Sequence, residues 1–195
     1  MSKEFASADL TMGQMNAIVK KIGGRDAALR LLRGELVVFR TIETWKSVLI
    51  GASKSVDDLS KTLENKGFKI SDWTSDLLKR TPLAKTLTEI ELVLVSVADL
   101  GFTERTDLYA FYNRAKEFGL DLVPAEVGPQ LRLVYSNQPM GEHLFIGMEP
   151  IADSNADLSV FLLAHLENGK LLSTRSSWNP KILLTETLWV FARRK

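Results

Sequence analysis

The runs Leu158-Ser-Val-Phe-Leu-Leu-Ala-His-Leu166 and Lys170-Leu-Leu-Ser-Thr174 flank the dipeptide Asn168-Gly169, and together they form the strongest β-hairpin signal in the sequence. Asn-Gly favours the tight turns that join antiparallel strands. Other short apolar runs, bounded by Pro and Gly, predict further strands at residues 131–135, 143–148 and 187–192. The last third of the chain is therefore predicted to form a mostly antiparallel sheet.

Helices are predicted mainly in the first two-thirds of the chain. Thr11 lies three residues before Gln14, which is the spacing of a capping box, and apolar residues follow at helical intervals. Gly23-Gly24 ends this helix, and a second short helix is expected directly after it. Ser55 and Ser71 are expected to cap two further helices, because each precedes a segment with a helical apolar pattern.

The predicted fold class is α+β, with a mostly antiparallel sheet in the C-terminal third, helices packed on one face and a small N-terminal helical pair. Residues 91–97 are almost all apolar or β-branched and predict a strand buried on both faces. A shorter β-like run covers residues 36–39. Residues 1–40 are expected to form an N-terminal helical element and 41–195 an α+β domain, and the alternative is a single domain.

Composition excludes several classes of protein. The 195 residues include 25 Lys and Arg against 24 Asp and Glu, so the net charge of +1 gives no overall attraction to nucleic acid or anionic membranes. The absence of Cys excludes disulfides, thiolate nucleophiles and thiolate metal sites. No apolar stretch reaches membrane-spanning length and the first residues lack an apolar signal core, so we expect a cytoplasmic protein with no membrane partner.

Positive charge is concentrated in the N-terminal helical pair. Between Met12 and Arg33 there are five cations and one anion, Asp26. The cations are Lys20, Lys21, Arg25, Arg30 and Arg33. Two short helices across a Gly turn have the spacing of a helix-turn-helix, and a basic face could contact phosphates. The alternative is an amphipathic hairpin whose solvated face carries these side chains, because the second helix lacks an evident set of base-reading residues.

A second candidate site lies in the segment from Pro124 to His143, which is dense in polar and turn residues. A strand over 131–135 would place Arg132 on the face opposite its leucines. Together with Glu126 and Glu142, Arg132 could form an acid–base or anion-binding site, and this catalytic interpretation predicts that the three side chains converge around a pocket. In the structural alternative, Arg132 pairs with one of the two glutamates and locks the Pro/Gly turns.

No motif predicts a cofactor or a metal. The sequence has no phosphate-binding loop, no dinucleotide-binding glycine motif and no nucleophile elbow. His143 and His165 are the only histidines, and neither lies at metal-ligand spacing from another ligand. The stretch Asp153-Ser-Asn-Ala-Asp157 has some likeness to a calcium loop but lacks its central Gly and terminal Glu, so a loop between strands is expected.

Several motifs carry a resemblance that covers most of the chain. They are Leu10-Thr-Met-Gly-Gln-Met-Asn-Ala-Ile-Val-Lys-Lys-Ile-Gly-Gly24, Pro124-Ala-Glu-Val-Gly-Pro-Gln-Leu-Arg-Leu133 and Gln138-Pro-Met-Gly-Glu142. With these motifs the chain resembles a family of uncharacterised bacterial proteins that is frequent in uncultivated candidate lineages. The family has no established activity, so the resemblance implies a bacterial source and no mechanism.

Three functions are compatible with these patterns. The leading prediction is a non-catalytic binding or regulatory protein of the bacterial cytoplasm, which contacts nucleic acid through the basic helical pair or binds a protein partner. The alternative is a hydrolase- or transferase-type enzyme that uses Glu126, Arg132 and Glu142. A third possibility, a structural or interaction protein associated with mobile elements, predicts a large exposed apolar patch.

Overall fold

The computed structural model describes residues 10–33, 42–176 and 183–194. The chain divides into two compact units, Met1–Thr41 and Ile42–Lys195. The β-like run expected at residues 36–39 lies outside the described residues. In the described part of the chain, no helix has the length and apolar content needed to cross a membrane.

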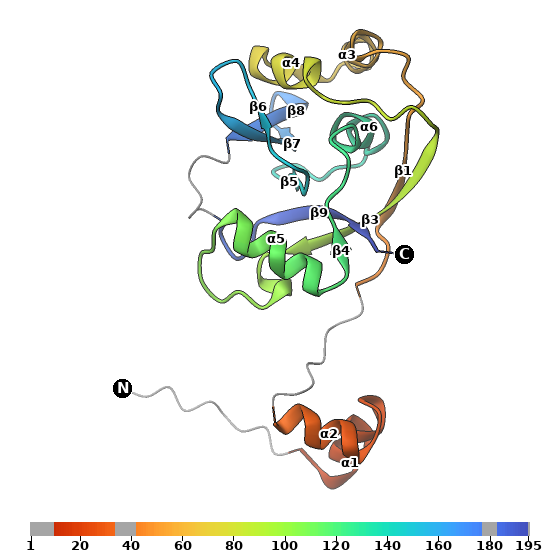
Figure 1. The fold of residues 1–195 in the computed structure, drawn as a ribbon, viewed down its shortest axis with the longest axis vertical. Helices are drawn as coiled ribbons and strands as arrows, with labels where there is room; N and C mark the ends of the chain where they lie inside the picture. Colours follow the sequence, from red (N-terminus) through yellow and green to blue (C-terminus); the bar gives the residue numbers. More distant parts are fainter. Residues whose placement is uncertain (1–9, 34–41, 177–182, 195) are drawn as a thin grey trace. The chain divides into compact units, whose positions relative to one another are not determined.

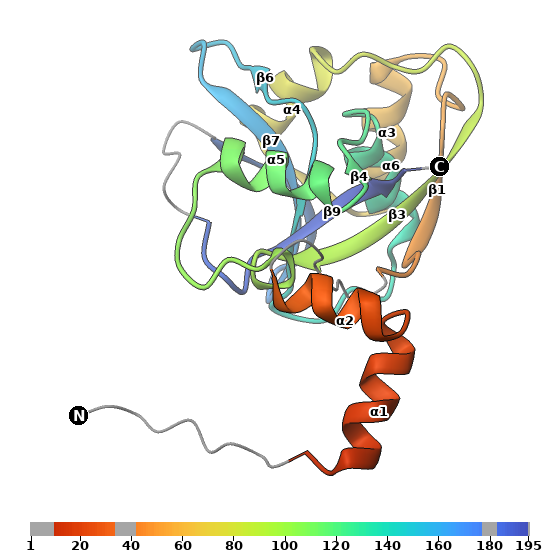
Figure 2. The ribbon, with the colours of Figure 1, turned by 60° about the horizontal axis from the view of Figure 1, so that its bottom comes forward.

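The N-terminal unit contains helices α1 (Met12–Lys21) and α2 (Arg25–Leu32), joined by a tight glycine turn (Figure 2). The Thr11 hydroxyl accepts from the Gln14 N–H, and the Gln14 side chain accepts from the Thr11 N–H at 2.8 Å. The predicted capping box is therefore confirmed. Gly23 and Gly24 have φ angles of 104° and 92°, which glycine adopts without steric cost, and this explains why the chain turns there.

The larger unit is built on one sheet, to which nine described strands belong (Figure 1). The strands are β1 (Lys46–Ile50), β2 (Lys69–Ile70), β3 (Thr88–Ser96), β4 (Leu120–Asp121), β5 (His143–Ile146), β6 (Ile151–Ala152), β7 (Leu158–Leu166), β8 (Gly169–Ser176) and β9 (Leu188–Arg193). The main order is β1-β3-β9-β5-β7-β8-β2, with β4 on β9 and β6 on β7. Among the described pairs, β5–β9 and β2–β8 are parallel and the others antiparallel, so the predicted α+β class is confirmed.

Helices lie on both faces of this sheet (Figure 1). On one side are α3 (Val56–Asn65), α4 (Asp72–Lys79) and α6 (Val127–Val134), and on the other is α5 (Leu108–Glu117). The Phe111 ring of α5 lies 5.4 Å from the Trp189 ring of β9, measured between centroids. On the opposite face, α6 packs closely against β7: a Cβ atom added to Gly128 would lie only 2.8 Å from the Phe161 side chain.

The central strands explain why both faces are covered. In the register of the sheet, Val93 pairs with Phe191 and Val95 with Trp189, and these four side chains face α5. The neighbouring residue Val190 is buried as well and points to the other face, because side chains alternate along a strand. Apolar side chains on both faces require cover on both, so the expectation of helices on one face holds for α3, α4 and α6 only.

One predicted strand is a helix. The alternation of residues 131–135 predicts a strand, but residues 127–134 form α6. Pro129 is the third residue of this helix, where its missing N–H is one that a helix leaves unpaired in any case. Gln130 and Arg132 are both buried, so the apolar–polar alternation does not mark an exposed face.

The predicted hairpin joins β7 to β8, with its turn displaced by one residue. Leu166 pairs with Gly169, so Glu167 and Asn168 form the loop. Gly169 has a φ of 114° and begins β8. The Asn-Gly signal therefore locates the hairpin correctly, while the glycine supplies the unusual backbone angle at the first paired position.

Candidate functional site

Glu126 occupies the N-cap position of α6, makes no capping hydrogen bond with its side chain and has an exposed fraction of 0%. Its Oε1 atom accepts from the Gly51 N–H at 2.9 Å and from Gln130 Nε2 at 3.1 Å. Its Oε2 atom accepts from the Ala84 N–H at 2.7 Å. The donors belong to the residue after β1, the segment before β3 and α6 itself, so the carboxylate joins three separate parts of the chain.

Arg132 lies on the same helix and also has an exposed fraction of 0%. Its guanidinium donates to the Gln138 side-chain oxygen and to the Tyr135 carbonyl, and it lies 5.0 Å from the centroid of the Phe68 ring. Burial lowers the pKa of Arg132 to about 10, because the charged form loses its hydration. Its Nε atom is buried with no hydrogen-bond partner among the described residues.

Glu142 is half-buried and is paired with Tyr135 rather than with Arg132. The Tyr135 hydroxyl donates to Glu142 Oε2 at 2.9 Å. Burial first, and then the hydrogen bond and charge of Glu142, raises the pKa of Tyr135 to about 12. The Trp45 ring packs edge-on against Tyr135 with 5.0 Å between the centroids. Gln138 Nε2 donates to the Glu142 carbonyl at 3.2 Å and thereby holds the turn that carries Glu142.

The predicted catalytic trio is therefore divided between two groups of contacts. Arg132 and Glu142 share Tyr135 and Gln138 as partners. Glu126 has its own partners at the other end of α6, and six residues of helix correspond to about 9 Å along the axis. Among the described residues no ion pair joins Arg132 to either glutamate. The structure brings Arg132 and Glu142 together and leaves Glu126 apart.

The histidines and the Asp153–Asp157 segment have local structural partners. Nδ1 of His165 lies 2.7 Å from the Gln138 carbonyl oxygen, and Nδ1 of His143 lies 3.0 Å from the Gly141 carbonyl oxygen. Each imidazole therefore contacts a backbone carbonyl of the segment between α6 and β5.

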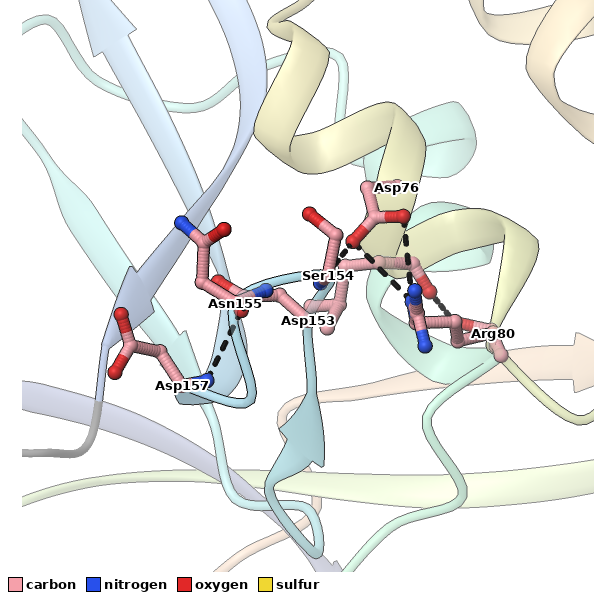
Figure 3. Close-up of polar contacts among 8 residues, drawn as sticks. Asp76, Arg80, Asp153, Ser154, Asn155 and Asp157 are labelled. Atoms are coloured by element: carbon pink, nitrogen blue, oxygen red, sulfur yellow. Dashed lines mark hydrogen bonds and ion pairs between the residues drawn. The ribbon is translucent and has the colours of Figure 1, made fainter.

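The segment from Asp153 to Asp157 is the loop between β6 and β7, as the sequence predicts (Figure 3). Asp153 Oδ1 accepts from the backbone of Asn155 and Asp157, and Asp76 of α4 accepts from the Ser154 N–H at 2.7 Å. Arg80 forms an ion pair with Asp76 at 3.2 Å. Within residues 10–33, 42–176 and 183–194, no group of three or more His, Asp or Glu is placed to hold a metal ion.

The five predicted nucleic-acid-binding cations are all exposed. They are Lys20, Lys21, Arg25, Arg30 and Arg33. Three of them lie in last turns, two in α1 and one in α2, where positive charge also offsets the helix dipole. Part of this charge therefore has a local structural use.

The same unit has exposed apolar side chains, whose location the sequence does not predict. Met12, Met15 and Ile18 of α1 have exposed fractions of 68%, 43% and 44%, and Leu32 of α2 reaches 83%. Their helical spacing predicts a buried face, and spacing alone cannot tell a buried face from one that awaits a partner. The exposure of such large side chains is the signal that only the structure supplies.

Comparison of the chain with protein-family models, with curated proteins and with solved structures found no match.

Proposed function

We propose that the protein is a non-catalytic nucleic-acid-binding protein of the bacterial cytoplasm, and that α1 and α2 form its contact surface. The observation that carries the proposal is the exposed charge of this unit. Between Met12 and Arg33 lie five of the 25 Lys and Arg of the chain but only one of its 24 Asp and Glu. The remainder of the chain has an excess of acidic residues, so a polyanion would be attracted to this unit in particular.

The arrangement on α2 suits a phosphate backbone. Arg25 and Arg30 of α2 and the C-cap residue Arg33 fall within about 140° of the helix circumference, at about 100° per residue, so the three positions share one side of the helix. Arginine contacts phosphate oxygens in a bidentate manner. No Asn or Gln lies on α2 to read base edges, and we therefore expect binding with little dependence on base sequence.

The environment of the catalytic candidates supports a non-catalytic role. Glu126 and Arg132 are buried and hydrogen-bonded within the fold, so a substrate cannot reach either group without displacing its partners. If the protein is instead a hydrolase or transferase, the remaining candidate catalytic residues are the hydrogen-bonded pair Tyr135 and Glu142. The raised pKa of Tyr135 makes its hydroxyl a weaker acid than that of an ordinary tyrosine, which does not suit proton transfer at neutral pH.

The test is fluorescence anisotropy of the full chain with labelled duplex DNA and labelled single-stranded RNA, at about 50 mM and about 200 mM salt. The test variant replaces four cations: Lys20→Gln, Lys21→Gln, Arg25→Gln and Arg30→Gln. We expect binding of the unmodified protein at low salt, and a salt slope that falls by up to about 3–4 in the variant, since each lost phosphate contact removes nearly one counterion.

A matched variant controls for net charge. It removes four exposed cations from the larger unit: Lys54→Gln, Lys61→Gln, Lys66→Gln and Lys69→Gln. Binding should be retained in this protein. Absence of binding by the unmodified chain at low salt, or equal loss in the two variants, would contradict the proposal. Comparing the affinities for the two labelled probes shows whether the protein prefers duplex DNA or single-stranded RNA.

A further inference from the structure

The tip of the hairpin that joins β7 to β8 carries an Asn-Gly dipeptide. Glu167 and Asn168 form the loop, and Gly169 follows as the first residue of β8. No other Asn of the chain precedes a Gly. Asn168 is exposed, so water reaches its side-chain amide. The dipeptide that predicts the hairpin therefore also places a labile side chain in solvent, since Asn is among the heat-labile residues of proteins.

The side-chain amide of an Asn can react with the backbone nitrogen of the next residue. This nitrogen loses its proton and bonds to the Cγ atom of the Asn, and the side-chain nitrogen leaves as ammonia. The product is a succinimide ring. Water then opens the ring: cleavage of the bond from nitrogen to Cγ gives Asp, and cleavage of the bond to the main-chain carbonyl gives isoaspartate. The sequence of steps consumes one water, releases one ammonia and involves no oxidant or reductant.

Gly169 leaves the attacking nitrogen accessible. A side chain on the residue that follows an Asn hinders ring closure, and glycine has none. Gly169 has a φ of 114°, and a Cβ atom added to it would meet no atom beyond its chain neighbours within 4 Å in the described part of the chain. The backbone is therefore uncrowded on the side where a side chain would lie.

Ring closure requires the end of the hairpin to open. The Gly169 nitrogen must turn toward the Asn168 side chain, and Gly169 is paired with Leu166 in the sheet. This pair is the last one of the β7–β8 ladder, and Leu166 and both loop residues are exposed, so its separation exposes little apolar surface. The preceding residue, His165, is held from the other side, because its carbonyl accepts from the Gly141 N–H at 2.7 Å. Opening is thus confined to the tip.

Asn155 provides a comparison within the same chain. It is also exposed and lies in the loop between β6 and β7, but it precedes Ala156 (Figure 3). The Ala156 N–H donates to the Asp153 carbonyl at 3.0 Å, and the Asn155 N–H donates to Asp153 Oδ1 at 2.9 Å. The nitrogen that would attack is therefore held inside a hydrogen-bonded loop and carries a methyl group beside it. Exposure alone does not make an Asn reactive.

We propose that Asn168 deamidates spontaneously in the folded protein, through a succinimide formed with the Gly169 nitrogen, to give Asp or isoaspartate. Both products turn an uncharged side chain into an anion at the tip of the hairpin. Isoaspartate also adds a carbon to the backbone of the loop, which disturbs the pair of Leu166 and Gly169. The reaction uses none of the residues proposed to bind nucleic acid, so it is tested independently of that proposal.

The test is a long incubation of the full chain in mildly alkaline buffer, followed by peptide mass spectrometry. Replacement of the amide NH₂ by OH raises the mass of the peptide that contains Asn168. We expect conversion at Asn168 to exceed conversion at Asn155 many-fold, and to become faster as the pH rises, because the attacking nitrogen must lose its proton. Protein isoaspartate methyltransferase with a labelled methyl donor then measures the isoaspartate fraction. Asn168→Gln should show no conversion at this position over the same period, because its longer side chain closes a larger ring.

A matched variant separates the effect of the hairpin from that of the dipeptide. Ala156→Gly gives Asn155 a following glycine as well, at a position where φ is already 65°. We expect Asn168 to react several-fold faster than Asn155 in the folded variant, and the two to react at similar rates in guanidinium chloride. An Asn168 that stays intact in the folded protein while it converts in guanidinium chloride would overturn the proposal. Equal rates at the two positions in the folded variant would contradict the argument from the opening of the tip.

Discussion

Glu126 is an acidic residue whose side chain links separate parts of the fold. The two oxygens of Glu126 accept two backbone N–H groups from distant loops, and the Gln130 amide supplies a third donor. The Gln130 amide also donates to Ser53 Oγ at 3.0 Å, so this group of contacts links α6 to the residues after β1 as well. The three donors replace water as hydrogen-bond partners of the buried carboxyl oxygens.

Replacing this carboxylate by an amide is expected to destabilise the larger unit. In Glu126→Gln, the amide NH₂ must face the N–H of Gly51 or Ala84, and one donor is left unpaired. We expect the free energy of unfolding to fall by about 2–3 kcal/mol, measured by urea denaturation. Glu89→Gln on the exposed side of β3 is the matched control and should change stability by less than about 0.5 kcal/mol. Equal changes in the free energy of unfolding of the two variants would show that Glu126 does not link these parts of the fold.

The Tyr135–Glu142 pair predicts a loss of stability in alkali. The pKa of Tyr135 rises from 10.0 to about 12 on folding, chiefly through burial. The unfolded chain releases this proton first as the pH rises, so the contribution of Tyr135 is complete below pH 10 and is lost between 10 and about 12. Arg132 acts in the opposite sense over this range, because its pKa is lowered to about 10 from 12.5.

A difference measurement isolates Tyr135 from Arg132. Tyr135→Phe keeps the ring against Trp45 and removes the titrating hydroxyl. We expect the difference in unfolding free energy between the unmodified protein and this variant to be constant below pH 10 and to shrink as the pH approaches 12. A difference that stays constant across this range would mean that Tyr135 titrates alike in the folded and unfolded chains.

Helix α6 packs closely against β7 at Gly128. A Cβ atom at Gly128 would lie 2.8–2.9 Å from three atoms of the Phe161 side chain. Alanine in place of a helical glycine ordinarily adds stability, but we expect Gly128→Ala to lower the free energy of unfolding by about 1–3 kcal/mol through overpacking. The cost should become smaller in a Phe161→Ala background, which removes two of the three close atoms, as a double-mutant cycle would measure. The same cost in both backgrounds would contradict this contact.

The helices also show which elements a sequence can predict. The Ser55 side chain accepts from the Asp58 N–H at 3.1 Å, and the Ser71 side chain accepts from the Thr74 N–H at 3.3 Å, as their spacing predicts. Such caps depend on neighbours three residues away. In contrast, α6 depends on partners that are 75 and 42 residues from Glu126, and local alternation therefore predicts the wrong element.

The candidate site, like the helices, was predictable from the sequence only where it depends on residues close together in the chain. Tyr135 and Glu142 lie seven residues apart, and their proximity follows from the turn between α6 and β5. The separation of Glu126 from this group depends on the helix that replaced the predicted strand. The exposed cations of the N-terminal pair agree with an amphipathic pattern, but the exposure of Met12 and its neighbours is a tertiary property. Periodicity identifies an apolar face and does not say what covers it.

For the whole molecule, the distribution of the core predicts that the larger unit folds alone. Every residue of the core cluster, and every apolar residue packed against it, lies from Ile42 onward. We expect residues 42–195 to retain the cooperative thermal unfolding of the full chain, as measured by calorimetry, and to lose the low-salt binding of nucleic acid. A fragment that aggregates or melts without cooperativity would show that the first 41 residues contribute to the core.

The position of β9 has a consequence for protein synthesis. This strand comes after all other described strands in the chain, yet it lies in the middle of the sheet, where β3, β4 and β5 all pair with it. While the ribosome is still translating the region before Leu188, the nascent chain has the other strands but not the one that joins them. The open edges of β3 and β5 can pair wrongly during that interval, and they make the emerging chain a candidate for chaperone protection.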